Sequence, residues 1–469
     1  MARVFLLFTT LYMVKSKKVA KEKGGREVYF EIIKVALPAV LEMILHMVVG
    51  IVDTAMVGRL GATAVAGVSL GAQIIFSTFF VFAAIGTGGG ALAAQALGAK
   101  KKEEVKKFFS YSLLLAFFAG FLLFFLPYIV EIILPALKID KNVALVTISY
   151  LKTIGKFAVF ALLVFVGNGL LRAIGQTRVP LYTAVVINCL NIFLDYVLIF
   201  GKLGFPKLGP GGAALASGIS LTLGSIIALG YIGLIEKKLS LKFQWLEIRV
   251  YLKKIIQISI PAALEEGSFS LGRVVVSFIL VKLGAVSFAA NEIAIYIESL
   301  AYMPGYGLAI AAYSFAARFY GEGNYQKAKS YIEKTLNLTI LGMGLMGIIF
   351  FFLPQQLGLL FTKDVDVLEK IKVCLKIGAF EQIPTGIEMV LGSVYRGVGN
   401  TKIPFYLTTA GMWLFRLPLF WYLFVLNKYD VSYAWMVSVL QWSILMSIYL
   451  YLFQKGHWWS VTELQRDQG

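Results

Sequence analysis

The chain has 469 residues, of which 59% are hydrophobic and 15% charged, and its mean hydropathy is +0.79. Soluble globular proteins carry about 25% charged residues, so this composition excludes a soluble enzyme or binding protein. The formal net charge is +18, but Lys and Arg gather in alternate loops such as Lys100–Lys107 and Lys237–Lys254, which indicates orientation in a membrane rather than nucleic-acid binding.

Apolar stretches of about 20 residues or more follow one another along the chain, and each is long enough to cross about 30 Å of hydrocarbon as a helix. Lipid offers the backbone no hydrogen bonds, so such stretches should be helical. We expect an all-α integral membrane protein with twelve transmembrane helices, at 33–57, 66–94, 108–131, 147–170, 179–201, 211–235, 251–281, 288–316, 332–353, 371–395, 404–426 and 431–453.

The N-terminal segment before the first span is predicted to be a cytoplasmic tail. Its apolar run Val4–Leu11 is too short to cross a membrane and precedes the lysines, an order that does not fit a cleavable signal peptide. The loops rich in Lys and Arg include Lys15–Arg26 and Lys327–Lys334. By the positive-inside rule, these loops and both termini face the cytoplasm of a cell whose inner membrane holds the protein.

The first expected helix carries Glu42, His46 and Asp53 on one face. An Asp at the centre of a membrane helix costs about 2.5–3.5 kcal/mol on insertion scales, so such a residue usually faces a cavity or a partner. We therefore favour a functional role for Asp53 over a helix-packing carboxylate. His46 is explained as well by a satisfied core histidine.

The fifth expected helix carries Asn188, Asn191 and Asp195 at positions i, i+3 and i+7, again on one face. Amide and carboxylate oxygens can coordinate a monovalent cation, and a buried carboxylate can carry a transferable proton. The alternative is interhelical hydrogen bonding, a common use of Asn in membranes, which would account for Asn188 alone. We expect Asn191 and Asp195 to be functional.

The second half is richer in carboxylates within its spans. Glu298, Tyr302 and Tyr306 share a helix face, and a carboxylate flanked by aromatic rings suits an organic cation through ion pairing and cation–π attraction. The other acidic positions are Glu265, Glu266, Glu292, Glu381 and Glu388. Arg273 and Arg416 also fall within spans and could neutralise some of them, so an architectural ion-pair role stays open.

Sequence segments of the first half recur in the second half at a nearly constant offset. Leu37–Glu42 recurs as Ile260–Glu265, and Arg172–Pro180 recurs as Arg396–Pro404. Shorter repeats are Leu60-Gly61-Ala62 with Leu283-Gly284-Ala285, and Gly98 with Gly321. The chain is therefore predicted to be a duplicated bundle of six plus six helices. Because six is even, the two repeats are parallel, an arrangement typical of transporters.

The order and spacing of these segments resemble the multidrug and toxic compound extrusion (MATE) family over nearly the whole chain after residue 30. The segments that carry the resemblance are Pro38–Gly61, Leu171–Thr177, Asn191–Asp195, Ile297–Gly305 and Tyr395–Thr401. The resemblance implies a V-shaped, twelve-helix transporter that expels cationic, amphipathic compounds by antiport with H⁺ or Na⁺, without a further cofactor, and works as a monomer.

The resemblance also implies a set of site residues. In one family branch a cation site lies in the N-terminal half, and its positions match Asp53, Asn191, Asp195, Ser217, Tyr150 and Asn168. Na⁺, where it is the coupling ion, would bind at Asp53, Asn191 and Asp195. Other branches use acidic residues on helices seven, eight and ten, which makes Glu265, Glu298 and Glu381 candidates for substrate or ion binding. The usual acidic position on helix ten is Thr385 here, one turn from Glu381.

We therefore expect an exporter of small organic cations in the lipid bilayer. Its parts are a cytoplasmic tail, an N-terminal lobe, a cytoplasmic linker, a C-terminal lobe and a second tail, at 1–30, 31–236, 237–250, 251–455 and 456–469. A flippase for a lipid-linked precursor is the alternative, although relatives with that role have fourteen helices. A membrane enzyme acting on lipid is disfavoured because His46 and His457 are the only histidines and no catalytic set clusters in a loop.

Overall fold

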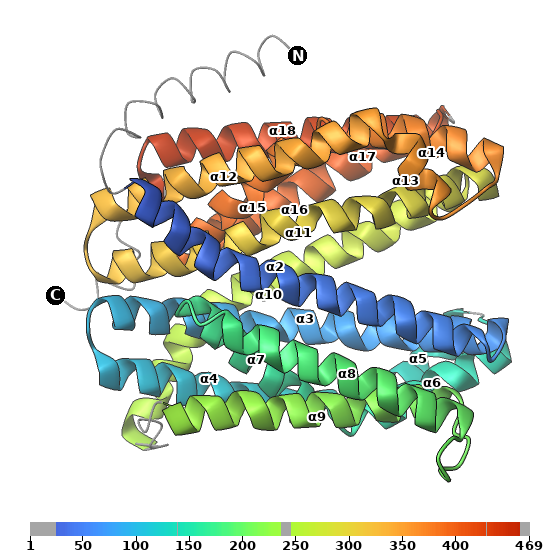
Figure 1. Ribbon diagram of the computed structural model, residues 1–469, viewed down its shortest axis with the longest axis horizontal. Helices are drawn as coiled ribbons and strands as arrows, with labels where there is room; N and C mark the ends of the chain where they lie inside the picture. Colours follow the sequence, from blue (N-terminus) through green and yellow to red (C-terminus); the bar gives the residue numbers. More distant parts are fainter. Residues whose placement is uncertain (1–24, 138, 236–244, 428, 460–469) are drawn as a thin grey trace.

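The computed structural model describes residues 25–137, 139–235, 245–427 and 429–459, and these are helical apart from short connections (Figure 1). The helices of the first half are α2 Gly25–Gly58, α3 Ala62–Gly98, α4 Lys102–Leu123, α5 Leu126–Ile133, α6 Lys141–Gly155, α7 Ala158–Ala173, α8 Arg178–Phe200 and α9 Pro210–Ile235. A short 3-10 turn, η1 Leu134–Leu137, follows α5. Residues 1–24 of the expected tail, most of the linker and 460–469 lie outside the described parts.

The second half repeats this order of helices. It contains α10 Trp245–Val281, α11 Ala285–Gly321, α12 Tyr325–Phe352, α13 Pro354–Leu359, α14 Val365–Gly378, α15 Gln382–Gly397, α16 Lys402–Ala410, α17 Leu417–Phe420 and α18 Ser432–Gln454. Two π-helical segments, η2 Gly411–Arg416 and η3 Trp421–Leu426, flank α17, and the 3-10 turn η4 His457–Trp459 ends the described chain.

Nine helices of the described chain are long and apolar enough to cross a membrane, or ten when the bent pair α6–α7 counts as one span. The charged α10 and the pair α14–α15 complete the two bundles, which confirms the expected twelve crossing segments. The fourth segment differs from the single helix expected at 147–170, because α6 and α7 meet at a bend of 64°. The tenth expected helix is likewise divided, at 379–381.

The eleventh segment is not a regular α-helix either, because η2 and η3 widen it on both sides of α17. Pro418 lies in this stretch, and a proline lacks the amide hydrogen of a helical ladder and crowds the carbonyl four residues earlier. The wider π-helical turn before Pro418 gives the proline ring room beside the preceding carbonyl groups. Such turns are frequent at functional sites.

The two halves form separate bundles, each with its own apolar core, and two long helices cross between them (Figure 1). α2 packs on α11 and α12 of the second bundle at its start and on α8 of the first bundle further along. α10 packs on α3 and α4 of the first bundle and on α16 and the following turns of the second. Each half of the sequence therefore contributes one helix, α2 or α10, that packs partly on the bundle of the other half.

At one end, the bundles meet through a reciprocal contact between α3 and α11. A Cβ atom added to Gly98 would lie 1.9 Å from the carbonyl oxygen of Arg318, and one added to Gly321 would lie 1.9 Å from that of Gln95. Each glycine thus admits the backbone of the opposite helix, and the two contacts are related by the sequence repeat. The Gln95 side chain also donates to the Gly397 carbonyl at 2.9 Å.

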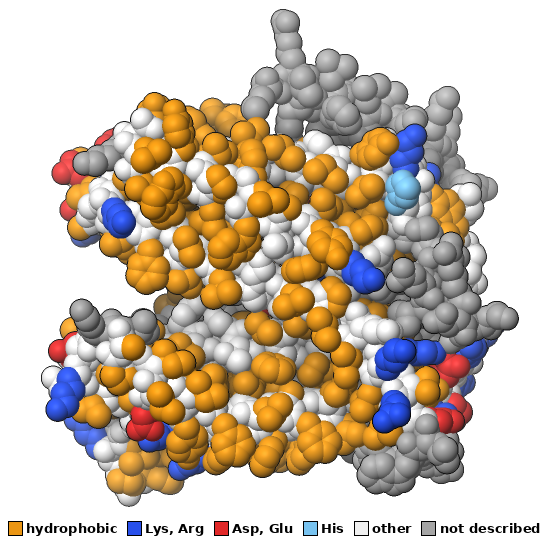
Figure 2. All heavy atoms as spheres, turned by 180° about the vertical axis from the view of Figure 1, so that it is seen from behind, with side chains coloured by type: hydrophobic (Ala, Val, Ile, Leu, Met, Phe, Trp, Pro, Cys, Tyr) orange, Lys and Arg blue, Asp and Glu red, His pale blue; other side chains and the backbone are white. Residues whose placement is uncertain are grey.

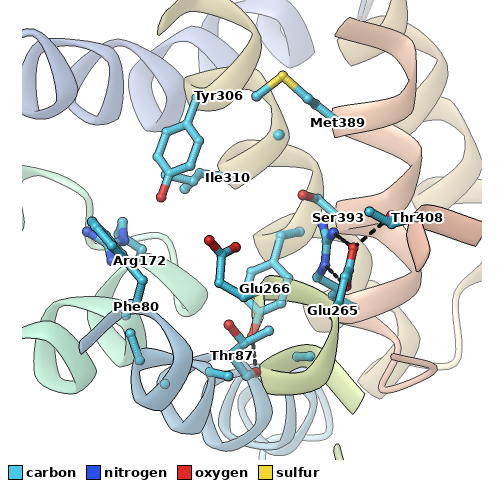
Figure 3. Close-up of a pocket in the computed structure, with 18 of the residues that line it drawn as sticks. Phe80, Thr87, Arg172, Glu265, Glu266, Tyr306, Ile310, Met389, Ser393 and Thr408 are labelled. Carbon is cyan, nitrogen blue, oxygen red and sulfur yellow. Dashed lines mark hydrogen bonds and ion pairs between the residues drawn. The ribbon is translucent and has the colours of Figure 1, made fainter. Parts of the chain in front are cut away.

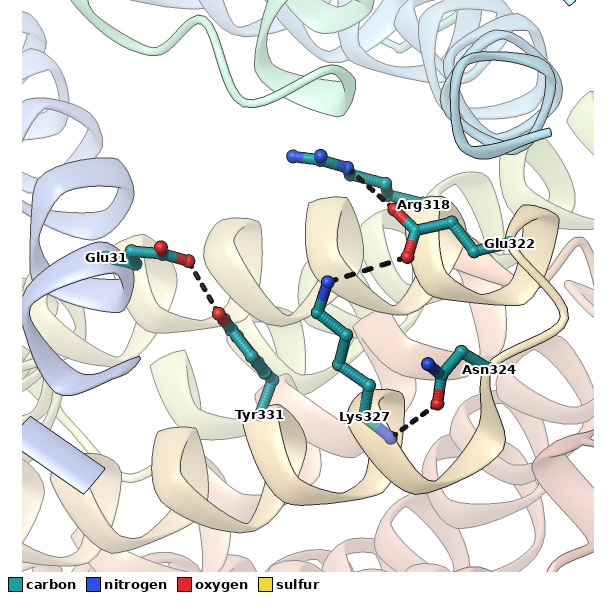
Figure 4. Close-up of polar contacts among 6 residues, drawn as sticks. All are labelled: Glu31, Arg318, Glu322, Asn324, Lys327 and Tyr331. Atoms are coloured by element: carbon teal, nitrogen blue, oxygen red, sulfur yellow. Dashed lines mark hydrogen bonds and ion pairs between the residues drawn. The ribbon is translucent and has the colours of Figure 1, made fainter. Parts of the chain in front are cut away.

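Polar contacts fix the start of α2 against the second bundle at this same end (Figure 4). The Tyr331 hydroxyl on α12 donates to Glu31 on α2 at 2.6 Å. Glu322 pairs with Arg318 at 3.2 Å and with Lys327 at 3.6 Å, and the Asn324 side chain caps α12 by accepting from the Lys327 amide at 3.0 Å. The contact of Glu31 with Tyr331 holds the start of α2 on the bundle to which it does not belong by sequence, and the other contacts join α11 to the start of α12.

Away from this contact the bundles separate, and the space-filling view shows a cleft that opens at the end holding α5, α6, α13 and α14 (Figure 2). Apolar side chains cover the flanks of both bundles in that view, as expected for surfaces that face lipid. The molecule is thus V-shaped, with the vertex where Gly98 and Gly321 lie.

We predict that Gly98→Ala and Gly321→Ala destabilise this V-shaped state, because their methyl groups would overlap backbone oxygens and overpacking costs about 1–3 kcal/mol. Thermal unfolding of the purified protein in detergent would measure the loss. Gly50→Ala is the matched control, since a Cβ there meets nothing within 4 Å. Equal unfolding midpoints for all three variants would contradict the reciprocal contact.

Candidate functional site

A polar cluster forms within the first bundle where α2, α6, α8 and α9 meet. Asp195 is 1% exposed and Asn191 3% exposed on α8, and Asp53 approaches them from α2, so the two carboxyl groups interact directly. The Asn191 amide donates to the Ser217 hydroxyl of α9 at 3.3 Å. Tyr150 of α6 lies within electrostatic reach of both carboxyl groups and contacts Ser217. Five of the predicted residues therefore come together.

A glycine makes room for the tyrosine of this cluster. A Cβ added to Gly71 on α3 would lie 2.7 Å from Cδ1 of Tyr150, so a larger residue would displace the ring from the two carboxyl groups. Tyr150 itself is 3% exposed. The close approach of α3 to α6 is thus part of what positions the cluster.

The other two predicted site residues, Asn188 and Asn168, form no hydrogen bond to the five residues of this cluster. Asn188 is buried one turn before Asn191, and neither atom of its amide group has a partner in the described chain. Asn168 on α7 is buried with its Oδ1 unpaired. Buried amides without partners are unusual in proteins, so both remain available to a ligand, to water or to another arrangement of the helices.

Two ion pairs with buried carboxylates occupy equivalent positions in the two bundles. Glu42 on α2 accepts from Arg172 on α7 at 2.7 Å, and Glu265 on α10 accepts from Arg396 on α15 at 2.6 and 3.3 Å. Glu265 also accepts from Thr408 at 3.1 Å. Glu265, a predicted substrate candidate, is therefore already compensated by protein groups.

In the sequence, Arg172 and Arg396 were identified only as the first residues of a repeated segment and not as partners of the glutamates. The signal that could have identified them was their repetition together with Glu42 and Glu265, because a pair of opposite charges that recurs at one offset is typical of a structural contact. Arg273 and Arg416, the other arginines within the spans, take no part in these two pairs: Arg273 lies over the Phe269 ring, and Arg416 donates to Gln441.

A second polar cluster lies inside the C-terminal bundle. Glu298 on α11 is 6% exposed and accepts from the Gln382 amide at 3.4 Å. Glu381 is 2% exposed at the break between α14 and α15 and accepts from the Tyr302 hydroxyl at 3.5 Å. Arg416 lies within electrostatic reach of both carboxyl groups. The structure thus brings Glu298, Tyr302 and Glu381 together.

Tyr306, which the sequence placed on the same face as Glu298 and Tyr302, lines a different space. It faces a cavity of about 460 Å³ between the two bundles, near the vertex (Figure 3). In Figure 3 the Tyr306 hydroxyl points toward Arg172, and the Glu266 carboxylate lies in the open space beside them. A volume of this size is in the range of sites for drug-sized molecules.

The chain is similar to known membrane transporters. The MatE family model matches it twice, at 38–197 and 261–422, so the two matches begin at the repeated prolines Pro38 and Pro261. The chain is 31% identical over 457 residues to the probable multidrug resistance protein NorM of Thermotoga maritima, covering 94% of this chain and 96% of that protein. It is 27% identical over 426 residues to the probable multidrug resistance protein YoeA of Bacillus subtilis, covering 89% and 91%.

Solved structures with a similar fold include an outward-facing multidrug resistance MATE family transporter of the MOP superfamily, with a TM-score of 0.84 at 20% identity over 93% of this chain and 97% of that one. A mutant of the Vibrio cholerae MATE transporter VcmN aligns with a TM-score of 0.84 at 18% identity, over 93% and 98%. These likenesses confirm the twelve-helix fold in two six-helix repeats.

We predict that Arg172→Gln is more destabilising than the double change Glu42→Gln with Arg172→Gln. Removing the guanidinium alone leaves a buried carboxylate uncompensated, which costs about 3–5 kcal/mol, whereas removing both charges leaves a neutral contact. Unfolding midpoints of the purified variants would separate the two cases. If single and double variants unfold at the same temperature, the pair has no structural role.

Proposed function

Since this chain belongs to the multidrug and toxic compound extrusion (MATE) family of membrane transporters, which are not enzymes, we propose that it is a secondary active antiporter exporting cationic, amphipathic small molecules. The exchanged ion is H⁺ or Na⁺, and its site is the cluster of Asp53, Asn191 and Asp195. The observation that carries the proposal is the direct approach of Asp53 on α2 to Asp195 on α8.

Two carboxylates that lie together in a membrane cannot both be ionised without compensation, because like charges repel and hydrocarbon does not solvate them. A proton shared by the pair, or a Na⁺ ion held with the neighbouring amide and hydroxyl oxygens, removes the repulsion. Such a cation is bound only while the two helices hold their carboxyl groups together.

The route of α2 links this site to the arrangement of the bundles. The same helix carries Glu31, which is bonded to α12 of the other bundle, and Asp53, which faces α8. A change in the contact between Asp53 and Asp195 therefore acts on a helix held by both bundles. Rocking of the bundles about the vertex, as in other transporters with parallel repeats, would open the cleft to the other side of the membrane.

We further propose that the protein lies in the inner membrane with both termini in the cytoplasm. The vertex lies beside the basic loops that follow α3 and α11, and these loops should be cytoplasmic. The cleft would then open to the outside, the state from which a drug is released. A flippase for a diphosphate-linked lipid is less well supported, because Arg172 and Arg396 are already paired with carboxylates.

We predict that Asp53→Asn and Asp195→Asn each lower ethidium transport into inverted vesicles at least about tenfold, since the repulsion between two carboxylates that requires a shared cation is then lost. Transport would be measured by ethidium fluorescence under proton and sodium gradients imposed separately. The gradient that drives the unaltered protein identifies the coupling ion.

Asp430→Asn is the control variant, because Asp430 lies in a loop and pairs with Lys370. It should transport at the rate of the unaltered protein. Full activity of both Asp53→Asn and Asp195→Asn, at equal membrane levels, would remove this cluster from the coupling mechanism.

A further inference from the structure

The cavity between the bundles contains more carboxylates than cations that could compensate them. Its charged lining consists of Arg172, Glu265, Glu266, Glu388 and Arg396. Arg172 is paired with the buried Glu42 behind it, and Arg396 is paired with Glu265. Glu266 and Glu388 are left over.

Neither remaining carboxylate has a hydrogen bond or an ion pair among the described residues. Glu388 on α15 is 6% exposed and lies beside Arg396, whose bonds go to Glu265. Both side chains lie next to Gly392: a Cβ atom added to this glycine would be 3.3 Å from Glu388 Oε1 and 3.4 Å from Arg396 Nη1. Glu388 and Arg396 are thus neighbours, but they form no ion pair. A carboxylate this deeply buried without a partner points to a missing cation.

Glu266 on α10 enters the cavity from another side. Figure 3 shows its carboxylate in the open space between Arg172 and the bonded Glu265. Arg273, two turns further along the same helix, lies within electrostatic reach of Glu266 without forming an ion pair with it, and its guanidinium lies over the Phe269 ring at 5.5 Å. The cavity therefore presents two carboxylates on different helices that accept no hydrogen bond and form no ion pair in the described chain.

The walls of the cavity are aromatic on both sides. Phe80 and Phe165 come from the first bundle, and the second bundle contributes Phe269, Tyr306, Tyr313 and Trp442. Aromatic faces attract cations through their quadrupoles, and flat rings stack on them. This combination suits a polycyclic aromatic cation rather than a lipid phosphate or a neutral apolar compound.

We propose that Glu266 and Glu388 form the cation-recognition site of this cavity and that its preferred ligand is an aromatic compound with two positive charges. This inference rests on the proposed export function and specifies its substrate class. It assigns Glu265 to the architecture of the bundle and assigns recognition to the adjacent Glu266. The ligand spans the two carboxylates while its rings lie between the aromatic walls.

Ethidium and propidium provide a matched pair of probes, because they share the phenanthridinium ring and propidium carries a second positive charge on its side chain. We expect the purified, full-length protein in detergent to bind propidium about tenfold more tightly than ethidium, the scale of one additional charged contact. Glu266→Gln and Glu388→Gln should each reduce this ratio to about one, as measured by fluorescence titration.

The ratio of the two dissociation constants does not depend on the fraction of folded protein, so a partly unfolded variant still gives a usable result. Glu292→Gln, an exposed change on α11 away from the cavity, should keep the ratio of the unaltered protein. Equal affinity for both dyes in the unaltered protein, or a ratio that neither cavity variant changes, would overturn the proposal.

The same dyes separate this inference from the proposed function. Gradient-driven ethidium transport together with a ratio insensitive to Glu266→Gln and Glu388→Gln would leave the antiporter intact and place recognition elsewhere. The expected ratio without transport under either gradient would support the binding site and contradict the export function. No binding of either dye would overturn both.

Discussion

The structure depends on the free energy of placing charge in hydrocarbon. A membrane helix bundle can keep a buried carboxylate or guanidinium only where another group, a ligand or a proton compensates it. In this protein the buried carboxylates of Glu42 and Glu265 are compensated at short distances by Arg172 and Arg396, which line the cavity. Carboxylates left without such a partner then mark the places where a mobile cation can act.

Compensation also explains how the crossing helices are held. α2 and α10 each leave one bundle and enter the other, and each carries the glutamate of an ion pair where it joins the bundle of its own half. The pairs tie these helices to α7 and α15, while the glycine contact at the vertex joins α3 to α11.

Sequence reasoning predicted the helices and the duplication from hydropathy and repetition, and helix periodicity placed Asn191 and Asp195 on one face. The meeting of Asp53 with these residues was implied only by the resemblance to a known family. The bend between α6 and α7 could not be read in this way, since Lys156 and Phe157 interrupt the helix without a proline or a glycine pair at the break. The π-helical turns beside Pro418 could not be predicted from the sequence either.

Contacts between helices that are distant in the sequence could not be predicted either. Tyr306 follows Glu298 and Tyr302 on one helix face, yet two turns of α11 carry it out of the C-terminal cluster and into the cavity between the bundles. Glu265 was a candidate for substrate or ion binding because its partner lies 131 residues away in the sequence, and packing decides which arginine pairs with it. Periodicity assigns a residue to a face but does not identify what that face meets.

The repeat distinguishes charges that maintain the fold from charges that can serve transport. The pair of Glu42 and Arg172 recurs as Glu265 and Arg396, which is expected when both copies of a bundle need the same contact. The candidate transport residues do not recur, because the positions equivalent to Asp53 and Asp195 in the second half are Val276 and Leu419.

Apart from Glu265, the carboxylates of the second half that line the cavity or the C-terminal cluster likewise have no acidic counterparts in the first half. The positions equivalent to Glu266 and Glu388 in the first half are Met43 and Val164, and those equivalent to Glu298 and Glu381 are Ile75 and Phe157. A charge needed only to build a six-helix bundle would be needed in both copies. Under the proposed function, the charges found in only one copy assign ion coupling to carboxylates of the first half and recognition of the exported cation to carboxylates of the second half.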